Sequence, residues 1–197
     1  NIWTDYDVFQ KNKVPLTVNQ NENDPIIFGS FVALRKINDN VILLWSKVLK
    51  KFSNTKIYFK ARELRDKQVE KKFKEKFYNH GISSDRLILE ESSDHLTYLK
   101  SYSKVHISLD PFPFNGVSTS FESIWMGVPV FCLKGNSALS RCSYSINKNL
   151  KMEDWIAENE NDYLIKLEKI LSNKKQLLLT KKNLRKKAMN NNLFNSK

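Results

Sequence analysis

From residue 26 onward, short apolar runs alternate with longer segments in which apolar residues recur every three or four positions. The short runs predict buried strands, and the longer segments predict amphipathic helices. We expect strands at 26–28, 57–59, 87–89, 105–109 and 128–133. We expect helices at about 39–52, 69–79, 94–103, 118–126, 138–148, 161–171 and 174–189. Residues 1–25 are polar and poorly patterned, which predicts an extended lead-in or linker.

This alternation predicts the fold class. Strands that alternate with helices of about ten residues form right-handed βαβ units, whose parallel sheet is covered on both faces. We therefore expect an α/β, doubly wound, Rossmann-like domain over 26–173, followed by a basic C-terminal helix and tail over 174–197. Ligands of such folds bind beyond the carboxyl ends of the strands, where the strand order reverses. The segments to search are those that follow strands: 29–36, 60–64, 91–95, 110–119 and 134–141.

Composition excludes several classes of protein. The hydrophobic content of 41% suits a folded domain. The sequence has no apolar run long enough for a membrane span and no secretion-signal pattern. The two cysteines form no disulfide framework, which favours a cytoplasmic setting. The cysteines and the three histidines lack the spacing of a metal site, and no nucleophile elbow of a hydrolase is present.

The formal net charge of +12 favours anionic ligands. The basic residues crowd into 65–76 and 174–187, where charge runs usually form solvated helix faces. Aromatic residues are not interleaved with them as on RNA-binding surfaces, so nucleic acid is not the expected partner. The alternative function is nevertheless a non-catalytic basic module, a degenerate domain that binds a partner protein or nucleic acid.

The segment 110–129 carries the strongest candidate chemistry. Two prolines stiffen the exit from a strand, and an Asn-Gly pair ending at Gly116 predicts a tight turn. Ser118 and Thr119 then stand at the start of a helix, where free N–H groups and the helix dipole favour a phosphate. Glu122 lies one turn further on, where a carboxylate can accept hydrogen bonds from ribose hydroxyls. A simpler interpretation is that Ser118 caps the helix itself and Glu122 is a first-turn acid.

Lys36 is the candidate cation. It follows the first predicted strand and precedes Asn38, which is expected to cap the next helix. The helix dipole disfavours a cation at this place, so a role in function is favoured over a solvated lysine. A lysine here can contact a diphosphate as a point charge.

Four motifs carry a family resemblance: Phe28-Gly-Ser-Phe with Lys36-Ile-Asn, Leu109-Asp-Pro-Phe-Pro-Phe-Asn-Gly, Ser118-Thr-Ser-Phe-Glu-Ser-Ile-Trp-Met-Gly-Val-Pro-Val, and Ser140-Arg. Together they resemble the C-terminal catalytic lobe of the O-linked N-acetylglucosamine (O-GlcNAc) transferases. The similarity is greatest to bacterial members, often fused to tetratricopeptide repeats, and to plant relatives that use GDP-fucose. It covers about 25–196 and ends in the near-terminal motif Asn192-Leu-Phe-Asn-Ser.

The resemblance implies the C-terminal lobe of a GT-B glycosyltransferase. The donor would be UDP-N-acetylglucosamine (UDP-GlcNAc), bound without a metal or other cofactor, and the acceptor a Ser or Thr of a protein. Lys36 would contact the diphosphate and stabilise the leaving UDP. Ser118 and Thr119 would contact the phosphates beside Gly116, and Glu122 would contact the ribose. The family also carries a histidine near the base, with basic residues nearby.

His95 and Lys100 are the candidates for that histidine and a neighbouring cation, although an exposed structural role suits His95 equally well. Three departures from the family pattern stand out: Val117 where animal members carry His, His106 at the opening of a strand, and Ser143 in place of Gly. His106 is expected to be structural. An N-terminal lobe and tetratricopeptide repeats are the expected partners, so we expect the chain to be a fragment or one half of a split enzyme.

Overall fold

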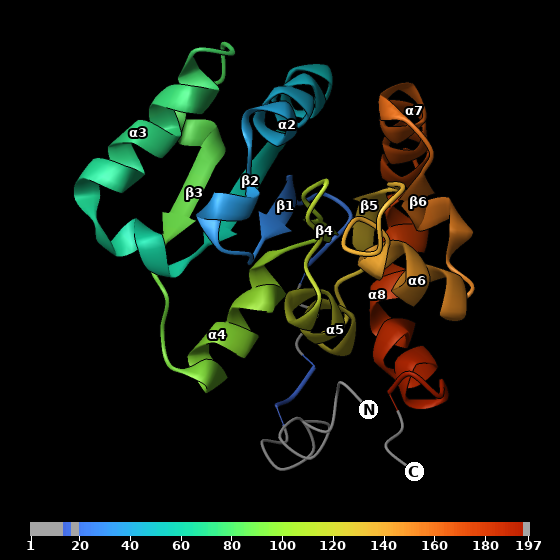
Figure 1. Cartoon of the computed structure of the whole chain (residues 1–197). Coiled ribbons are helices and arrows are strands. Elements are labelled where there is room, and N and C mark those ends of the chain that lie inside the picture. The colour runs from blue at the N-terminus through green and yellow to red at the C-terminus, as the bar shows by residue number, and fades with distance from the viewer. Residues whose placement is uncertain (1–13, 17–19, 195–197) are drawn as a thin grey trace.

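Six parallel strands form the central sheet of the described part of the chain, in the order β3-β2-β1-β4-β5-β6 (Figure 1). The structure is a computed structural model, and it describes residues 14–16 and 20–194. The strands are β1 (Ile26–Ser30), β2 (Thr55–Lys60), β3 (Leu87–Glu90), β4 (Ile107–Leu109), β5 (Val130–Leu133) and β6 (Ile156–Ala157).

The strand order reverses at β1. The chain runs outward from β1 to β3 on one side and then returns to place β4 on the other, with Phe28 opposite Ile107 and Gly29 opposite Ser108. Gly29 has a steric reason to be glycine, because a Cβ there would lie 2.5 Å from a methyl group of Val105. The expected doubly wound sheet is confirmed, and the carboxyl ends of β1 and β4 mark its switch point.

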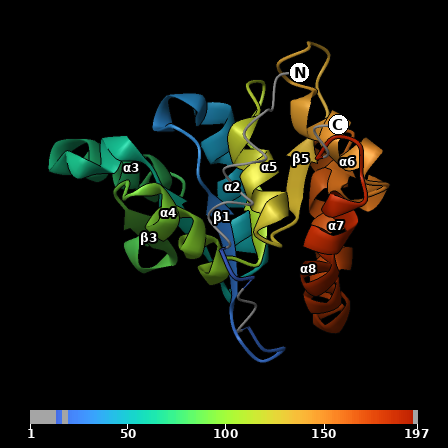
Figure 2. The ribbon, with the colours of Figure 1, turned by 90° about the horizontal axis from the view of Figure 1, so that it is seen from below.

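Helices cover both faces of this sheet. In Figure 1, α2, α3 and α7 lie above the sheet and α4, α5 and α8 below it; Figure 2 looks onto this lower group. The helices are α2 (Asp39–Lys51), α3 (Lys67–Tyr78), α4 (His95–Ser101), α5 (Ser118–Trp125), α6 (Cys142–Asn149), α7 (Glu160–Leu171) and α8 (Lys174–Met189). Short 3-10 turns lie at Leu34–Lys36, Arg62–Arg65, Ser84–Arg86, Tyr102–Lys104 and Glu153–Trp155.

Local signals explain several helix boundaries. The Asn38 side chain accepts a hydrogen bond from the Val41 N–H and begins α2, as predicted. Gly81 and Gly127 follow α3 and α5 with φ of 74° and 72°, a conformation that glycine adopts without strain. Both stops were therefore visible in the sequence.

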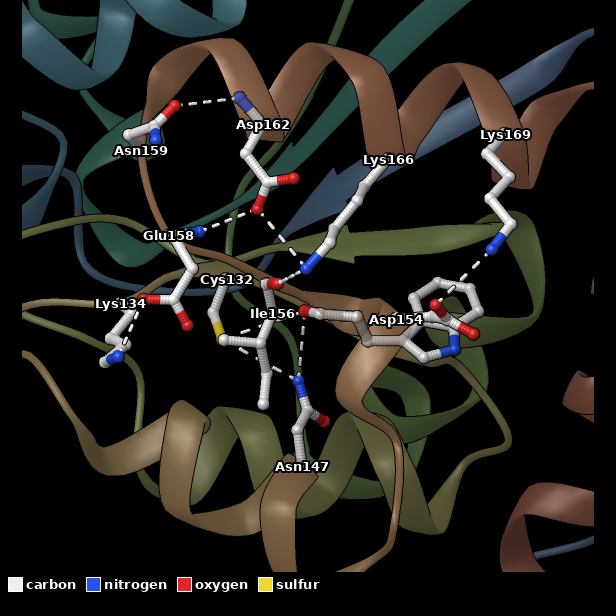
Figure 3. Close-up of polar contacts among 11 residues, drawn as sticks. Cys132, Lys134, Asn147, Asp154, Ile156, Glu158, Asn159, Asp162, Lys166 and Lys169 are labelled. Carbon is white, nitrogen blue, oxygen red and sulfur yellow. Dashed lines mark hydrogen bonds and ion pairs between the residues drawn. The ribbon is translucent and has the colours of Figure 1, made fainter.

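The sixth strand, β6, was missed because two residues show no apolar period. Polar side chains on both sides of this short strand hold it in place by hydrogen bonds to backbone carbonyls (Figure 3). The Asn147 amide donates to the carbonyls of Val130 and Trp155, at 2.9 and 3.3 Å. From the other side, Lys166 Nζ donates to the Ile156 carbonyl at 2.5 Å. These hydrogen bonds fix the edge strand of the sheet. Because they come from other segments of the chain, the local sequence of β6 does not predict the strand.

Helix α6 begins at Cys142 and not near residue 138 as expected. The preceding segment forms a closed loop in which the Ser140 hydroxyl accepts from the Ser137 N–H at 2.9 Å. A Cβ at Gly135 would lie 2.2 Å from that hydroxyl, so glycine permits the closure. Serines that bond to nearby backbone compete with helix formation, which explains the late start.

The two ends of the described chain pack onto the domain. Arg185 donates to the carbonyl of buried Val14 at 2.8 Å, and the Gln20 amide donates to Ser103 at 2.8 Å. The described part of the lead-in is therefore docked, whereas 1–13 and 17–19 lie outside the described residues. At the other end, α8 contributes buried Leu177, Leu184 and Ala188 to the core. Phe194 packs edge-on against Phe121, while the last residues of the near-terminal motif, 195–196, are outside the described part.

Candidate functional site

Lys36 reaches across the switch point of the sheet. It ends the 3-10 turn after β1, and its Nζ donates to the Asn115 carbonyl at 2.9 Å. The same nitrogen lies 4.0 Å from the centroid of the Phe114 ring. Burial lowers the pKa of Lys36, and the nearby Asp110 carboxylate opposes that shift. The structure thus places the ammonium group of Lys36 on Asn115, which stands three residues before the first residue of α5.

The loop after β4 is held by its own hydrogen bonds. Buried Asp110 accepts the Gly116 N–H at 2.7 Å, and the Asn115 amide donates to the Pro111 carbonyl at 2.9 Å. The N-cap residue of α2 also holds this loop, because Asn38 Nδ2 donates to the Phe112 carbonyl at 2.8 Å. A loop fixed in this way presents the Lys36 contact and the start of α5 in one preorganised arrangement.

Gly116 is required for space and not for backbone conformation. Its φ is not among the positive values of the described residues. A Cβ at this position would lie 2.4 Å from Thr119 Oγ1, 3.0 Å from Ser120 Oγ and 3.1 Å from Asp110 Oδ1. The turn therefore brings the backbone close to the first turn of α5, and any side chain at 116 would displace the Thr119 hydroxyl.

Helix α5 begins without a side-chain cap. Its N-cap residue is Val117, and Ser118 is the first helical residue, so the interpretation that Ser118 caps the helix is wrong. Among the described residues, the backbone N–H groups of Ser118 and Thr119 have no acceptor. Uncapped N–H groups at a helix start form an anion site together with the helix dipole.

Glu122 and His95 are brought together one turn further along α5. The Glu122 carboxyl accepts from the Tyr98 hydroxyl at 3.0 Å, and its other oxygen lies 3.4 Å from His95 Nε2. Burial raises the pKa of Glu122, and the hydrogen bond from Tyr98 opposes that shift. Lys100 is exposed and lies roughly 140° around α4 from His95, so it does not share the face that meets Glu122.

Two residues of this site were missed in the sequence. Tyr98 stands four positions before Tyr102, and this spacing on one helix face is the signal that was available. Asp110 is an acidic residue at the end of a buried strand. Because acidic side chains are rarely buried without a partner, its position was a signal of a functional or structural role. Ser143, the departure from the family glycine, is buried with its Oγ 2.9 Å from Ser120 Oγ and 3.3 Å from the Gly116 carbonyl. Its hydroxyl ties the start of α6 to the loop after β4.

His106 is structural, as expected. It is buried at the opposite, amino end of β4, where its Nδ1 accepts the Ile27 N–H at 3.0 Å. Burial lowers the pKa of His106 to about 4, so the ring is neutral at pH 7. It has no part in the candidate site.

The buried Asp110 carboxyl should make the free energy of unfolding depend on pH. Burial raises the pKa of its carboxyl from 3.8 to about 7, so between these values the folded chain keeps a proton that the unfolded chain has released. The free energy of unfolding should therefore fall as pH rises from 4 to 7, by up to ~1.4 kcal/mol per pH unit from this group. We expect the stability of the unaltered chain, relative to Asp110→Asn, to fall over this range and level off above pH 7.

Urea denaturation of both chains at pH 4.5, 5.5, 6.5 and 7.5 measures this difference. His106 contributes a slope of opposite sign near the acid end, but it is present in both chains and cancels. Parallel stability profiles for the two chains would show that Asp110 titrates as an ordinary carboxyl.

Neither a metal cluster nor a membrane span is found in the described residues. Over 14–16 and 20–194, no three or more His, Cys, Asp or Glu side chains gather where they could hold a metal ion. Over the same ranges, no helix is both long and apolar enough to cross a membrane.

Comparison with known sequences gives a family match. Residues 9–197 match the model of the family described as Glycosyl transferase family 41. The chain is 31% identical over 146 residues to SPINDLY of Eustoma exaltatum subsp. russellianum, named a probable UDP-N-acetylglucosamine–peptide N-acetylglucosaminyltransferase. This covers 72% of the chain and 16% of that relative. The SPINDLY protein of Solanum lycopersicum is 29% identical over the same share of the chain and 15% of its own length. The chain thus spans about one sixth of these relatives.

Solved structures share the fold. A mutant of the Thermobaculum terrenum O-GlcNAc transferase matches with a TM-score of 0.79 and 24% identity, over 86% of this chain and 34% of that one. Sucrose-phosphate synthase from Thermosynechococcus elongatus matches with a TM-score of 0.58 and 16% identity, over 94% of this chain and 43% of that one.

Proposed function

The chain belongs to glycosyl transferase family 41, and from this premise we propose that it is the donor-binding lobe of a protein O-GlcNAc transferase. Its fold is the doubly wound, Rossmann-like sheet of a GT-B glycosyltransferase lobe, as the sequence predicted. The proposed donor is UDP-GlcNAc, and the proposed reaction transfers the sugar to a Ser or Thr hydroxyl of a protein without a metal ion. The names of the relatives support both the donor and a peptide acceptor.

One observation carries the proposal: Lys36 Nζ lies 2.9 Å from the Asn115 carbonyl, beside the uncapped start of α5. A positive side chain and free helix N–H groups at the switch point of a Rossmann-like sheet suit a pyrophosphate. Ser118 and Thr119 offer hydroxyls to the same phosphates. Glu122, one turn on, is placed to accept hydrogen bonds from the ribose.

The chemistry assigned to Lys36 is electrostatic. Negative charge develops on the leaving UDP as the bond to the sugar breaks, and a fixed ammonium group stabilises that charge more than it stabilises the bound donor. The N–H groups of α5 act in the same direction. In this proposal the two together replace the divalent cation that many sugar transferases use.

The remaining parts of the enzyme are proposals that follow from the family resemblance. An N-terminal lobe would bind the acceptor and close the cleft, and tetratricopeptide repeats would recruit protein substrates. Within the chain itself, both cysteines are free thiols, which suits the proposed cytoplasmic setting.

Thermal melting with nucleotides tests the proposed donor site. At a UDP concentration of 100 Kd, linkage stabilises the folded chain by about 2.7 kcal/mol, so the melting temperature should rise by roughly 5–10 °C. ADP at the same concentration is expected to give no comparable rise, and GDP-fucose in a third arm decides between the sugar donors of the family. A rise with heparin or polyuridylate, and none with UDP, would instead support the basic binding module.

A further inference from the structure

The carboxyl group of Glu122 is held on one side by an aromatic cluster that the proposed mechanism does not use. Tyr98 on α4 donates its hydroxyl to Glu122 Oε2 at 3.0 Å. Because the carboxylate is largely buried and yet approached by these two polar groups, Tyr98 and His95, its orientation is set by the protein. A carboxylate oxygen accepts more than one hydrogen bond, so this one retains capacity for a ligand.

The ring of Tyr98 has little freedom. Phe31, which follows β1, packs edge-on against Tyr98 with a centroid distance of 5.8 Å and stacks on Tyr102 at 3.7 Å. The hydroxyls of Tyr98 and Tyr102 lie 3.1 Å apart. Burial holds the pKa of Tyr98 well above its ordinary value, so the hydroxyl keeps the proton that it donates.

The same cluster is connected to the phosphate end of the site. The Tyr102 hydroxyl donates to the Thr119 carbonyl at 3.2 Å, in the first turn of α5. Each tyrosine hydroxyl has one proton, which Tyr102 donates to Thr119 and Tyr98 donates to Glu122, and the two hydroxyl oxygens lie 3.1 Å apart. This arrangement fixes the carboxylate relative to the residues proposed to hold the phosphates.

We propose that Tyr98 is a positioning residue, whose hydroxyl orients the Glu122 carboxylate toward the ribose hydroxyls and gives the site its preference for a ribonucleotide. The inference rests on the proposed function, because it needs a nucleotide at the start of α5. Ribose recognition then depends on a hydrogen bond from α4, the helix that also carries His95 and Lys100. A purely structural tyrosine would stabilise the fold without any dependence on the sugar of the ligand.

Calorimetric titration of UDP and of 2′,3′-dideoxy-UDP separates these roles. Tyr98→Phe removes the hydroxyl and keeps the ring, so we expect UDP affinity to fall about three- to tenfold and dideoxy-UDP affinity to stay unchanged. Tyr163→Phe is the matched control, since it removes a buried tyrosine hydroxyl from α7, on the other face of the sheet. That variant should bind both ligands as the unaltered chain does.

A second variant protects the test against a folding defect. In Glu122→Ala the acceptor of the Tyr98 hydroxyl is already lost, so adding Tyr98→Phe should not weaken UDP binding further. Equal losses for UDP and dideoxy-UDP, or additive losses in the double variant, would overturn the positioning role while leaving the donor site intact. Failure of the unaltered chain to bind UDP would overturn the proposed function together with this inference.

Discussion

Lys36→Ala should weaken UDP binding by about 10- to 150-fold. The ammonium group is the cation placed beside the start of α5, and hydrogen bonds to charged groups contribute about 1.5–3 kcal/mol. The loss should fall mainly on ligands that carry a diphosphate, so uridine itself should bind the variant and the unaltered chain with similar affinity. Calorimetry with UDP and with uridine measures both effects.

Lys47→Ala provides the control for the loss of a positive charge. Lys47 lies on α2, is exposed and pairs with Glu160 at 2.8 Å. Surface pairs of this kind contribute at most about 1 kcal/mol to stability, and this one lies outside the candidate site. If the two variants bind UDP equally well, Lys36 has no part in holding the diphosphate.

Gly116→Ala should cost at least tenfold in UDP affinity and should also destabilise the fold. The new methyl group would lie 2.4 Å from Thr119 Oγ1, so the Thr119 side chain must rotate away from its place at the start of α5. That rotation removes one candidate phosphate contact, which is worth about 1.5–3 kcal/mol. Overpacking against Ser120 and Asp110 adds about 1–3 kcal/mol of destabilisation if the loop cannot adjust.

Gly81→Ala separates the two effects. Gly81 follows α3 with φ of 74°, so alanine there is strained and should lower the melting temperature. The residue lies outside the candidate site, and UDP affinity should be retained. A Gly116→Ala chain that melts earlier but binds UDP normally would show that glycine at 116 serves packing alone.

Much of the fold could be predicted because its signals are local. The apolar period of α2, the cap at Asn38 and the glycine stop after α5 each require only a few neighbouring residues. The parallel, doubly wound class of the sheet then followed from the alternation of strands and helices, whereas the order of the strands comes from the structure. By contrast, β6 is two residues long and depends on Asn147 and Lys166, so no local pattern revealed it.

The part of the candidate site that could be predicted is the part whose residues are brought together by the backbone alone. Lys36, Gly116 and the residues at the start of α5 follow the ends of β1 and β4, and parallel strands bring those ends together. Contacts between helices were harder to predict from the sequence. Which residues of α4 face Glu122 depends on the rotation of that helix, and its true partners are Tyr98 and His95.

A crystal structure of the chain with UDP tests the central claim most directly. We predict that the diphosphate lies within hydrogen-bond distance of Lys36 Nζ and of the N–H groups of Ser118 and Thr119, with the ribose against Glu122. A diphosphate bound elsewhere, with Lys36 still on the Asn115 carbonyl, would contradict the account.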